Sequence, residues 1–378
     1  MTKLTVITVV GTRPEIIRLS RVIPEMDKFF NHKLIHTGQN FDYELNEIFF
    51  KQLKLRKPDF FLDSAGNSSA ETIGNVISKM DKVILDLKPD ALLILGDTNS
   101  CMSSIAAKRR KVPIFHMEAG NRCFDERVPE EIIRKIIDHI SDINLPYSDI
   151  AKNCLMNEGL KTDRIIKTGS PMKEILNFYH KEIYASNILE QLGLSKYKYF
   201  VVSAHREENV DSIENLKKII DALNAISDIY NFPIVVSTHP RTKKMLEKIN
   251  LDKFKNKDIR FMKPFGFLDY VNLQVNSFCV LSDSGTITEE SSILNFPALN
   301  LREAHERHEG FEECSVMMVG LDKDLILNSL EILREQKRGD QRDLKLVKEY
   351  DVDNVSKKIV RIIQSYTSYI NRLVWKKY

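Results

Sequence analysis

The feature that most constrains this chain is a recurring short apolar run, rich in valine, isoleucine and leucine, followed by a segment of helical period. This alternation is typical of parallel sheets that helices cover on both faces, because strands buried on both faces do not alternate apolar with polar residues. The runs form two series. The first comprises Leu4–Val10, Lys33–His36, Ala91–Leu95, Pro113–Phe115, Ile143–Leu145 and Arg164–Ile166. The second comprises Tyr199–Ser203, Pro233–Val236, Ile259–Met262, Phe278–Leu281 and Ala298–Leu301. The sequence therefore predicts an α/β fold with two Rossmann-like domains.

The length of the chain also favours two domains, since 378 residues exceed what one hydrophobic core usually serves. The two series separate near Gly169-Ser170-Pro171. We therefore expect an N-terminal domain over residues 1–169 and a second domain over 170–351. The remaining segment, 352–378, has apolar residues at helical spacing and predicts a closing helix, although periodicity does not say which domain it packs on.

Composition and charge exclude several classes of protein. The 43% hydrophobic and 29% charged residues are typical of a globular protein, and 56 basic against 53 acidic side chains are too balanced to indicate nucleic-acid binding. Five cysteines without a C-x-x-C spacing argue against a disulfide framework and a structural zinc site. The apolar run Leu4–Val10 is too short for a signal peptide or a membrane span. We expect a cytoplasmic protein with neither a membrane nor a nucleic-acid partner.

Polar and titratable residues crowd the positions directly after the predicted strands. In open α/β sheets, ligands bind beyond the carboxyl ends of the strands, so two such edges facing each other would make a cleft between the domains. These strand ends read Gly-Thr-Arg-Pro-Glu (11–15), Gly-Asp-Thr-Asn (96–99), His-Met-Glu-Ala-Gly (116–120), His-Arg-Glu-Glu-Asn (205–209), His-Pro-Arg (239–241) and Asp-Ser-Gly-Thr (283–286). We expect the active site in that cleft.

Three carboxylates of the first domain are candidates for acid–base chemistry. Asp97 and Glu118 follow neighbouring strands, and Glu130 stands in Val-Pro-Glu-Glu. Proton abstraction from carbon requires a base whose pKa is adjusted by burial or by neighbouring charges, and clustered acids supply that adjustment. Each acid alone is also explained as a helix cap. Among these acids Glu131 is the one best explained as solvated or structural.

The segment 282–290 predicts a phosphate site at the start of a helix. Backbone N–H groups of Gly285 and Thr286, together with the Ser284 and Thr286 hydroxyls, suit a phosphate, and Glu290 lies where it can accept hydrogen bonds from a ribose. A helix cap that satisfies only its own backbone explains the same residues equally well.

Other cationic residues at strand ends suit a diphosphate. Arg13 follows Gly11 in a helix start that matches neither G-x-G-x-x-G nor a P-loop, so neither NAD nor ATP is expected. His205 and Arg206 end the first strand of the second domain, where they can neutralise a departing diphosphate. His305 and His308 have a spacing that metal sites use, but the charged residues around them suit a sugar or phosphate site at least as well. We predict no metal and no cofactor.

The chain resembles the non-hydrolysing UDP-N-acetylglucosamine 2-epimerase family over essentially its full length. The resemblance rests on Gly-Thr-Arg-Pro-Glu, Gly-Asp-Thr, His-Met-Glu-Ala-Gly, Pro-Glu-Glu, His-Arg, Ser-Asp-Ser-Gly and Glu-Arg-x-Glu, in this order. It implies a two-domain fold like that of the GT-B glycosyltransferases, with the last helix returning to the first domain. It also implies elimination of UDP across C1–C2 of the sugar and its re-addition after C2 is protonated from the opposite face.

The resemblance implies roles for individual residues. Asp97, Glu118 and Glu130 are the implied candidates for proton transfer and for stabilising the oxocarbenium-like state, and His205 and Arg13 are the implied partners of the leaving group. The implied substrate-binding residues are Arg13, Arg18, Arg134, Arg206, Ser284, Gly285, Thr286 and Glu290. A UDP-sugar is the implied partner, and the protein is expected to be a homodimer.

Several residues depart from the UDP-N-acetylglucosamine enzymes. Arg18 replaces a lysine, 121–127 replaces a Leu-Arg-Thr run, and Thr286 replaces a glycine. Residues 15–20, 120–125 and 316–321 resemble instead the branch that makes UDP-N-acetyl-L-fucosamine from UDP-2-acetamido-2,6-dideoxy-L-talose for capsule or O-antigen. The alternatives are a UDP-GlcNAc/UDP-ManNAc 2-epimerase, a GT-B glycosyltransferase and a UDP-sugar sensor without activity.

Overall fold

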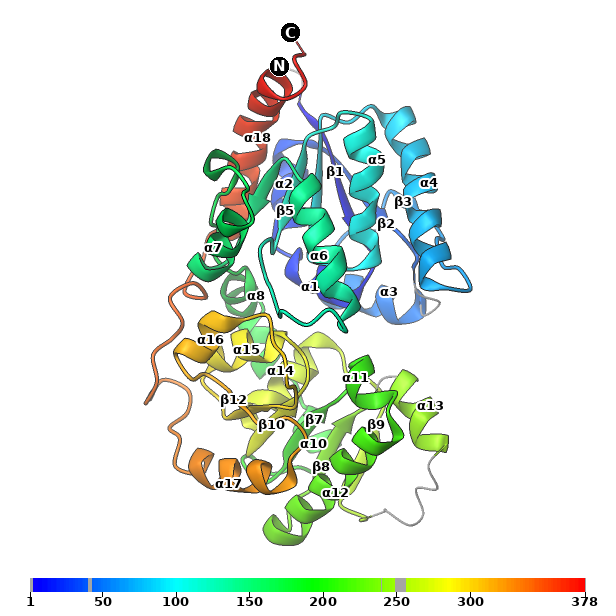
Figure 1. Ribbon diagram of the computed structural model, residues 1–378. Helices are drawn as coiled ribbons and strands as arrows, with labels where there is room; N and C mark the ends of the chain where they lie inside the picture. Colours follow the sequence, from blue (N-terminus) through cyan, green and yellow to red (C-terminus); the bar gives the residue numbers. More distant parts are fainter. Residues whose placement is uncertain (1–2, 40–42, 239, 249–255, 378) are drawn as a thin grey trace. The chain divides into compact units, whose positions relative to one another are not determined.

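The computed structural model describes residues 3–39, 43–238, 240–248 and 256–377 (Figure 1). The chain divides into two compact units, Met1–Asn177 with Glu349–Tyr378 as unit 1 and Phe178–Lys348 as unit 2. Each unit is built on one six-stranded sheet whose paired strands are parallel. The predicted fold class of two Rossmann-like α/β domains is therefore confirmed, whereas the predicted cleft stays a prediction.

The sheet of unit 1 has the strand order β3-β2-β1-β4-β5-β6. Its strands are β1 (Thr5–Val10), β2 (Asn31–His36), β3 (Phe60–Phe61), β4 (Ala91–Leu95), β5 (Ile114–Met117) and β6 (Ile143–Leu145). The helices are α1 (Arg13–Arg18), α2 (Val22–Phe29), α3 (Tyr43–Gln52), α4 (Ser69–Leu87), α5 (Ser103–Arg109), α6 (Pro129–Ile140), α7 (Asp149–Asn157), α8 (Met172–Phe178) and α18 (Val355–Leu373), with short 3₁₀ helices at Asn99–Met102 and Thr162–Arg164. Every residue of β4 is buried, and Leu92 and Ile94 pack in one core with Met80 of α4 and Ile137 of α6. Because β1, β4 and β5 are parallel neighbours, the segments after them meet at one edge of the sheet.

The sheet of unit 2 has the order β12-β11-β10-β7-β8-β9. Its strands are β7 (Phe200–Ser203), β8 (Ile234–Ser237), β9 (Ile259–Met262), β10 (Cys279–Ser282), β11 (Ala298–Asn300) and β12 (Met317–Met318). Its helices are α9 (His180–Tyr184), α10 (Ile188–Gln191), α11 (Glu207–Val210), α12 (Ile213–Tyr230), α13 (Pro240–Lys248), α14 (Phe267–Asn276), α15 (Thr286–Leu294), α16 (His308–Glu312) and α17 (Lys323–Leu333). Phe200 and Leu281 of the central strands pack with Ile226 of α12 and Leu330 of α17. The segments after β7 and β10 therefore lie next to each other.

Three details of the strand prediction differ from the structure. The run Arg164–Ile166 is not a strand, since only Ile165 forms an isolated bridge, to Asn144. The two edge strands β3 and β12 were not predicted, because two residues each are too few to show a pattern in the sequence.

The C-terminal helix α18 belongs to unit 1 and packs on α2 (Figure 1). It spans Val355–Leu373, and Val355, Ile359 and Ile363 are buried along one face, whereas Ile362 is partly exposed. The return of this helix to the first unit agrees with the predicted fold class. No helix within the described ranges is long and apolar enough to cross a membrane.

The division into compact units differs from the domain boundaries drawn from the sequence. The predicted second domain, 170–351, includes residues 349–351 and 170–177, but both segments group with unit 1. The reason is that the segment 170–177 bonds to the returning chain: Ser170 N–H donates to the Glu349 carbonyl at 3.0 Å, and the Glu174 carboxylate accepts from Ser356 N–H at 2.9 Å. That the first domain supplies the acid–base carboxylates and the second domain the phosphate site stays a prediction.

His36 at the end of β2 is a buried titratable group in unit 1. Its Nδ1 accepts a hydrogen bond from Gly38 N–H at 3.0 Å, and its ring stacks on Phe61 with centroids 5.1 Å apart. Burial lowers the pKa of His36 to about 4 from its usual 6.5. The folded protein therefore holds this imidazole neutral over a range in which the unfolded chain is protonated.

Stability should fall as the pH is lowered from 6.5 towards 4, because in that window the unfolded state binds a proton that the folded state does not. A shift of this size corresponds to a loss on the order of 3 kcal/mol. His36→Asn retains an acceptor for Gly38 N–H and should remove this part of the pH dependence in thermal melts between pH 7 and pH 4.5. Equal pH profiles for wild type and His36→Asn would contradict the expectation.

Candidate active site

Glu15 organises the segment after β1. Its buried carboxylate accepts from Gly11 N–H at 2.8 Å, from Thr12 N–H at 2.7 Å and from the Thr98 hydroxyl at 3.1 Å, and the Ser100 hydroxyl donates to it as well. Burial raises the pKa of Glu15, although these hydrogen bonds oppose the shift. A Cβ at Gly11 would lie 2.2 Å from Thr37 Oγ1, so any larger residue would require the Thr37 side chain to move. The hydrogen bonds of Glu15 therefore connect the turn that carries Arg13 to the turn that follows Asp97.

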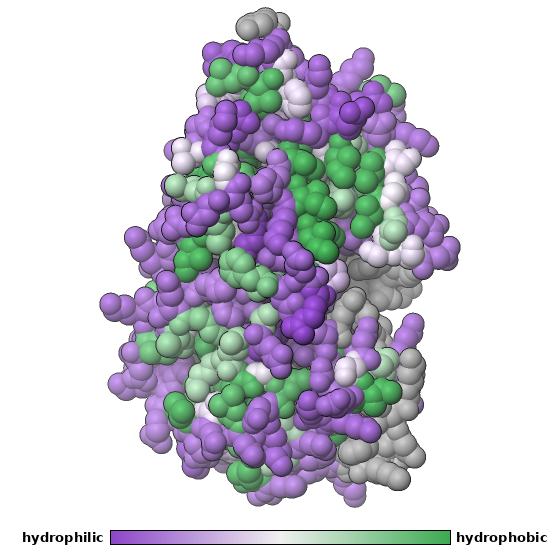
Figure 2. Space-filling model, viewed as in Figure 1, coloured by the Kyte–Doolittle hydropathy of each residue, from purple (hydrophilic) through white to green (hydrophobic). Residues whose placement is uncertain are grey.

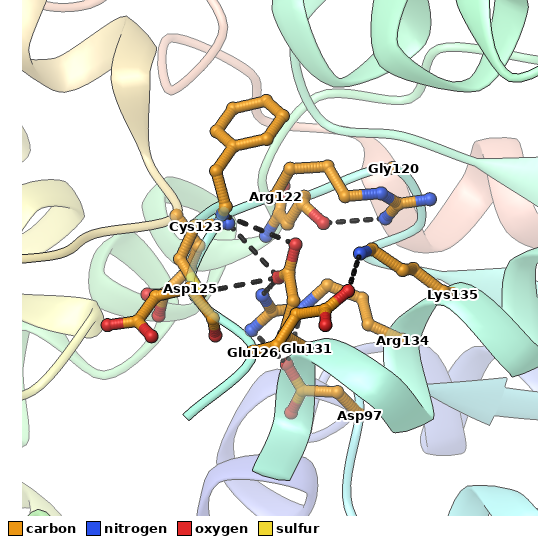
Figure 3. A network of polar contacts seen from close by, with 12 residues as sticks. Asp97, Gly120, Arg122, Cys123, Asp125, Glu126, Glu131, Arg134 and Lys135 are labelled. Atoms are coloured by element: carbon orange, nitrogen blue, oxygen red, sulfur yellow. Dashed lines mark hydrogen bonds and ion pairs between the residues drawn. The ribbon is translucent and has the colours of Figure 1, made fainter. Parts of the chain in front are cut away.

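Asp97 is held by Arg134 of α6 (Figure 3). Arg134 Nε and Nη2 donate to Asp97 Oδ2 at 2.9 and 2.6 Å, and Arg134 Nη1 donates to Glu131 Oε2 at 2.6 Å. The arginine is buried, whereas Asp97 is partly exposed. One buried guanidinium therefore joins the end of β4 to the first turns of α6.

Glu131, which the sequence explains as solvated or structural, has a structural role and is not solvated. It is completely buried, and it accepts from Cys123 N–H at 3.0 Å and Phe124 N–H at 3.3 Å (Figure 3). These bonds fix the segment after Gly120, in which Phe124 has a left-handed backbone with φ of 56°. Glu130 lies one residue earlier, in the first turn of α6, and is partly exposed.

Glu118 lies at the end of β5 and pairs with Arg18 of α1, Nη1 to Oε2, at 3.3 Å. Its φ of 65° is left-handed, which is rare for a residue with a side chain. The Arg18 guanidinium also lies 5.8 Å from the ring centroid of Tyr147. Asp97 and Glu118, which follow the neighbouring strands β4 and β5, therefore each pair with one buried arginine.

In unit 2, Asp283 organises the end of β7. Its buried carboxylate accepts from the backbone N–H groups of His205 and Arg206, both at 2.9 Å, and lies 3.2 Å from His205 Nδ1. Asn209 Nδ2 donates to the same carboxylate at 3.1 Å. Asp283 therefore orients the His205 ring and the backbone beside it.

The predicted phosphate segment forms the start of α15. The helix begins at Thr286 with Gly285 as its N-cap, and Ser284 Oγ lies 3.0 Å from Thr286 Oγ1. A Cβ at Gly285 would lie 2.4 Å from Glu306 Oε1. The Gly285 carbonyl accepts from Arg307 Nε at 3.1 Å. The chain therefore approaches its neighbours closely at this glycine.

The remaining predicted residues of unit 2 have charged or polar neighbours. Arg206 Nη2 lies 3.6 Å from Glu306 Oε1, and Glu306 Oε2 accepts from Arg302 Nη1 at 2.7 Å. Glu290 is buried and accepts from Gln274 Nε2 at 2.7 Å. The ribose role of Glu290 stays a prediction.

His305 and His308, whose spacing resembles that of metal ligands, lie side by side in the structure. The two rings have centroids 4.5 Å apart, and the ring of His305 stacks on Phe311 with centroids 3.8 Å apart. Burial lowers the pKa of His305 to about 4. Within the part of the chain that the structure describes, no three His, Cys, Asp or Glu side chains are grouped so that they could hold a metal ion.

Comparison with known proteins identifies the family. Residues 24–364 match the family described as UDP-N-acetylglucosamine 2-epimerase. The chain belongs to this family. The prediction of an epimerase, which is an isomerase, is therefore confirmed, while the narrower L-fucosamine branch is not tested by this match.

Solved structures and curated relatives agree with this assignment. A structure of UDP-N-acetylglucosamine 2-epimerase from Rickettsia bellii is 52% identical, with a TM-score of 0.94 and coverage of 99% of this chain and 100% of that chain. A UDP-GlcNAc 2-epimerase of Methanocaldococcus jannaschii, solved with UDP-GlcNAc and UDP, is 34% identical, with a TM-score of 0.89 and coverage of 96% and 99%. A UDP-2,3-diacetamido-2,3-dideoxy-D-glucuronate 2-epimerase of Pseudomonas aeruginosa is 34% identical over 86% of this chain and 90% of its own.

Three acidic residues, Glu15 and Glu131 in unit 1 and Asp283 in unit 2, organise the segments around them, although the sequence indicates no catalytic or binding role for them. Glu15 and Asp283 stand inside the motifs at the strand ends, and the sequence explains Glu131 best as solvated or structural. Their signal in the sequence was an acid beside glycine, serine or threonine at a strand end, which is also the signal of a helix cap. The sequence does not distinguish an acid that caps its own helix from one that fastens a distant loop.

Arg134→Met should destabilise unit 1 by about 3–5 kcal/mol, because it removes the cation from the buried Glu131 carboxylate. Urea denaturation followed by tryptophan fluorescence measures this directly, since Trp375 is the only tryptophan and lies in unit 1. Arg127→Met is the matched control: this arginine also pairs with a carboxylate, Asp125, at 2.8 Å, but its side chain is 81% exposed, so its loss should change little. If both variants lowered the free energy of unfolding equally, the buried pairing of Arg134 would contribute no more to stability than the exposed pairing of Arg127.

Proposed function

We propose that the chain inverts C2 of a UDP-2-acetamido sugar by eliminating UDP and adding it back. The observation that carries the proposal is the pairing of Asp97 with Arg134 and of Glu118 with Arg18 at the ends of adjacent parallel strands. Family membership and the UDP-GlcNAc and UDP in the M. jannaschii structure support it. The reaction needs two proton-transfer groups, one for each face of C2, and this edge of the sheet supplies carboxylates for them.

In the proposed first step, the C1–O bond to UDP breaks and a carboxylate removes the proton from C2, which leaves a 2-acetamidoglycal and UDP. In the return step, a second group delivers a proton to the opposite face of C2 and the diphosphate oxygen bonds to C1 again. No electrons are gained or lost overall. A C2 proton is weakly acidic, so cleavage at C1 must run ahead of proton removal, and stabilising the departing diphosphate advances it.

We assign the proton transfers to Asp97, Glu118 and Glu130, and the departing diphosphate to His205. Asp283 lies at Nδ1 of His205, so Nε2 is the ring nitrogen proposed to face the diphosphate. We further assign the substrate-binding roles to Arg13, Arg18, Arg134, Arg206, Ser284, Gly285, Thr286 and Glu290. The guanidinium groups suit phosphate and carboxylate oxygens because of their forked, planar donors.

The proposed sugar is UDP-2-acetamido-2,6-dideoxy-L-talose, converted to UDP-N-acetyl-L-fucosamine for capsule or O-antigen. The segment 120–125, close in sequence to Glu118, carries the residues that favour this branch. The relatives support UDP-GlcNAc equally, and the P. aeruginosa relative acts on a third sugar of the same class. The L-talose substrate and UDP-GlcNAc should therefore each be tested separately under the same assay conditions.

We propose that the reaction takes place in the cytoplasm and that the protein is a homodimer. All five cysteines are unbridged, as is typical of a reducing compartment.

Apolar side chains gather over α5 and α6, where Ile132 and Ile136 are 51% and 39% exposed (Figure 2). If this face is the dimer contact, Ile136→Asp should shift the protein to the monomer mass in light scattering. A dimer unaffected by that variant would place the contact elsewhere.

Product formed in D₂O should carry deuterium at C2, because the proposed route exchanges this hydrogen with solvent. The measurement is proton NMR of both UDP-sugars incubated separately with the enzyme. Epimerised product that keeps its original C2 hydrogen would contradict elimination and re-addition.

Glu118→Gln keeps the shape of the side chain but not its charge, and it serves as the control. It should neither invert C2 nor incorporate deuterium, while UDP affinity in calorimetry stays close to that of the wild type. Turnover within a few-fold of the wild type would leave the proton chemistry to Asp97 and Glu130.

A further inference from the structure

Two buried side chains of unit 1, His116 and Asp138, have no part in the chemistry above. His116 lies on β5 and Asp138 on α6, and both are fully buried. His116 Nε2 lies 2.8 Å from the Gly96 carbonyl oxygen, and His116 Nδ1 lies 2.9 Å from Asp138 Oδ1. The imidazole thus joins Asp138 to the residue directly before Asp97.

Asp138 also holds the loop that carries Glu118. Its carboxylate accepts from Gly120 N–H at 3.1 Å. Glu118 and Gly120 have φ of 65° and 83°, and a Cβ at Gly120 would lie 2.3 Å from the Ala151 carbonyl oxygen. A loop with two left-handed residues in three needs contacts that hold it, and Asp138 supplies one of them.

The charge of Asp138 is compensated within the protein. Burial by itself would raise the pKa of this carboxyl, but the contacts with His116 and Arg122 outweigh it and lower the pKa. Arg122 Nη1 donates to Asp138 Oδ2 at 2.7 Å, and Nε and Nη2 of the same arginine donate to the two oxygens of Glu158, both at 2.7 Å. The buried carboxylate is therefore a fixed acceptor with partners on several sides.

We propose that Asp138 and His116 are positioning residues for C2 inversion, because one buried carboxylate sets both the loop of Asp97, through His116, and the loop of Glu118, through Gly120. This proposal rests on the proposed function, which makes Asp97 and Glu118 the reacting carboxylates. A displacement of about 1 Å in such a group can cost on the order of 10²-fold in rate. Substrate binding is affected much less, because positioning acts on the reacting atoms.

A matched pair of variants separates positioning from stability. Asp142 is also fully buried and charged: it accepts from Ile114 N–H at 3.0 Å and from Lys108 Nζ at 2.6 Å. It anchors the first residue of β5, whereas Asp138 anchors the segment after the last one. Asp138→Asn and Asp142→Asn should both lower the melting temperature, but only Asp138→Asn should lower kcat, on the order of 10²-fold, with KM changed by at most about threefold.

A second pair of variants distinguishes the contact of His116 with Gly96 from its contact with Asp138. In His116→Gln the side-chain nitrogen lies about where Nε2 does and can still donate to Gly96, whereas in His116→Asn it lies about where Nδ1 does. The Gln variant should retain more of kcat than the Asn variant. Amide hydrogen exchange at residues 96–98 and 118–122 should quicken in Asp138→Asn and not in Asp142→Asn.

Three outcomes would overturn the proposal: kcat of Asp138→Asn within about threefold of the wild type, an equal loss in Asp142→Asn, or unchanged exchange at both loops. A wild-type protein that epimerises neither UDP-sugar contradicts the proposed function instead. In that case the exchange rates still show whether Asp138 holds the two loops.

Discussion

The buried guanidinium of Arg134, shared between Asp97 and Glu131, is the contact on which the arrangement of unit 1 depends. It joins the end of β4 to α6, and through Glu131 it reaches the backbone at Cys123 and Phe124. Helical spacing of four residues places Glu130, Arg134 and Asp138 along one side of α6. This helix therefore relates all three proposed proton-transfer groups to one rigid element.

Unit 1 and unit 2 each contain fully buried carboxylates, and each of these carboxylates is surrounded by hydrogen-bond donors. Glu15 accepts hydrogen bonds from backbone N–H and hydroxyl groups. Glu131 accepts hydrogen bonds from backbone N–H groups and from one guanidinium, and Asp283 accepts them from backbone N–H groups and from a side-chain amide. Removing a charge from water is expensive unless such partners replace the water, so these acids hold their partners in place and hold the loops that carry them. Preorganised loops are what proton transfer at carbon requires, since the reacting carboxylates must already lie at the right distance.

The long strands of both sheets could be predicted because a strand buried on both faces leaves a continuous apolar run, as in Ala91–Leu95. The same criterion failed for Arg164–Ile166, which is short and forms only one bridge, and for the two-residue edge strands β3 and β12. Edge strands of this length form because the neighbouring strand has unpaired backbone N–H and C=O groups to which they can hydrogen-bond. Backbone groups are the same for nearly every residue type, so this pairing has no pattern in the sequence.

The sequence by itself determined the α/β class, the two series of strands and the polar residues at their ends, because burial and helical period act on residues close together in the chain. Only the tertiary structure decided which partner each residue has. Arg134 and Asp97 are 37 residues apart, and Asp283 lies 78 residues from His205, so no local spacing relates them. His205 and Asp283 meet because they follow the adjacent parallel strands β7 and β10, and Asp97 meets Arg134 because helix α6 packs beside the end of β4.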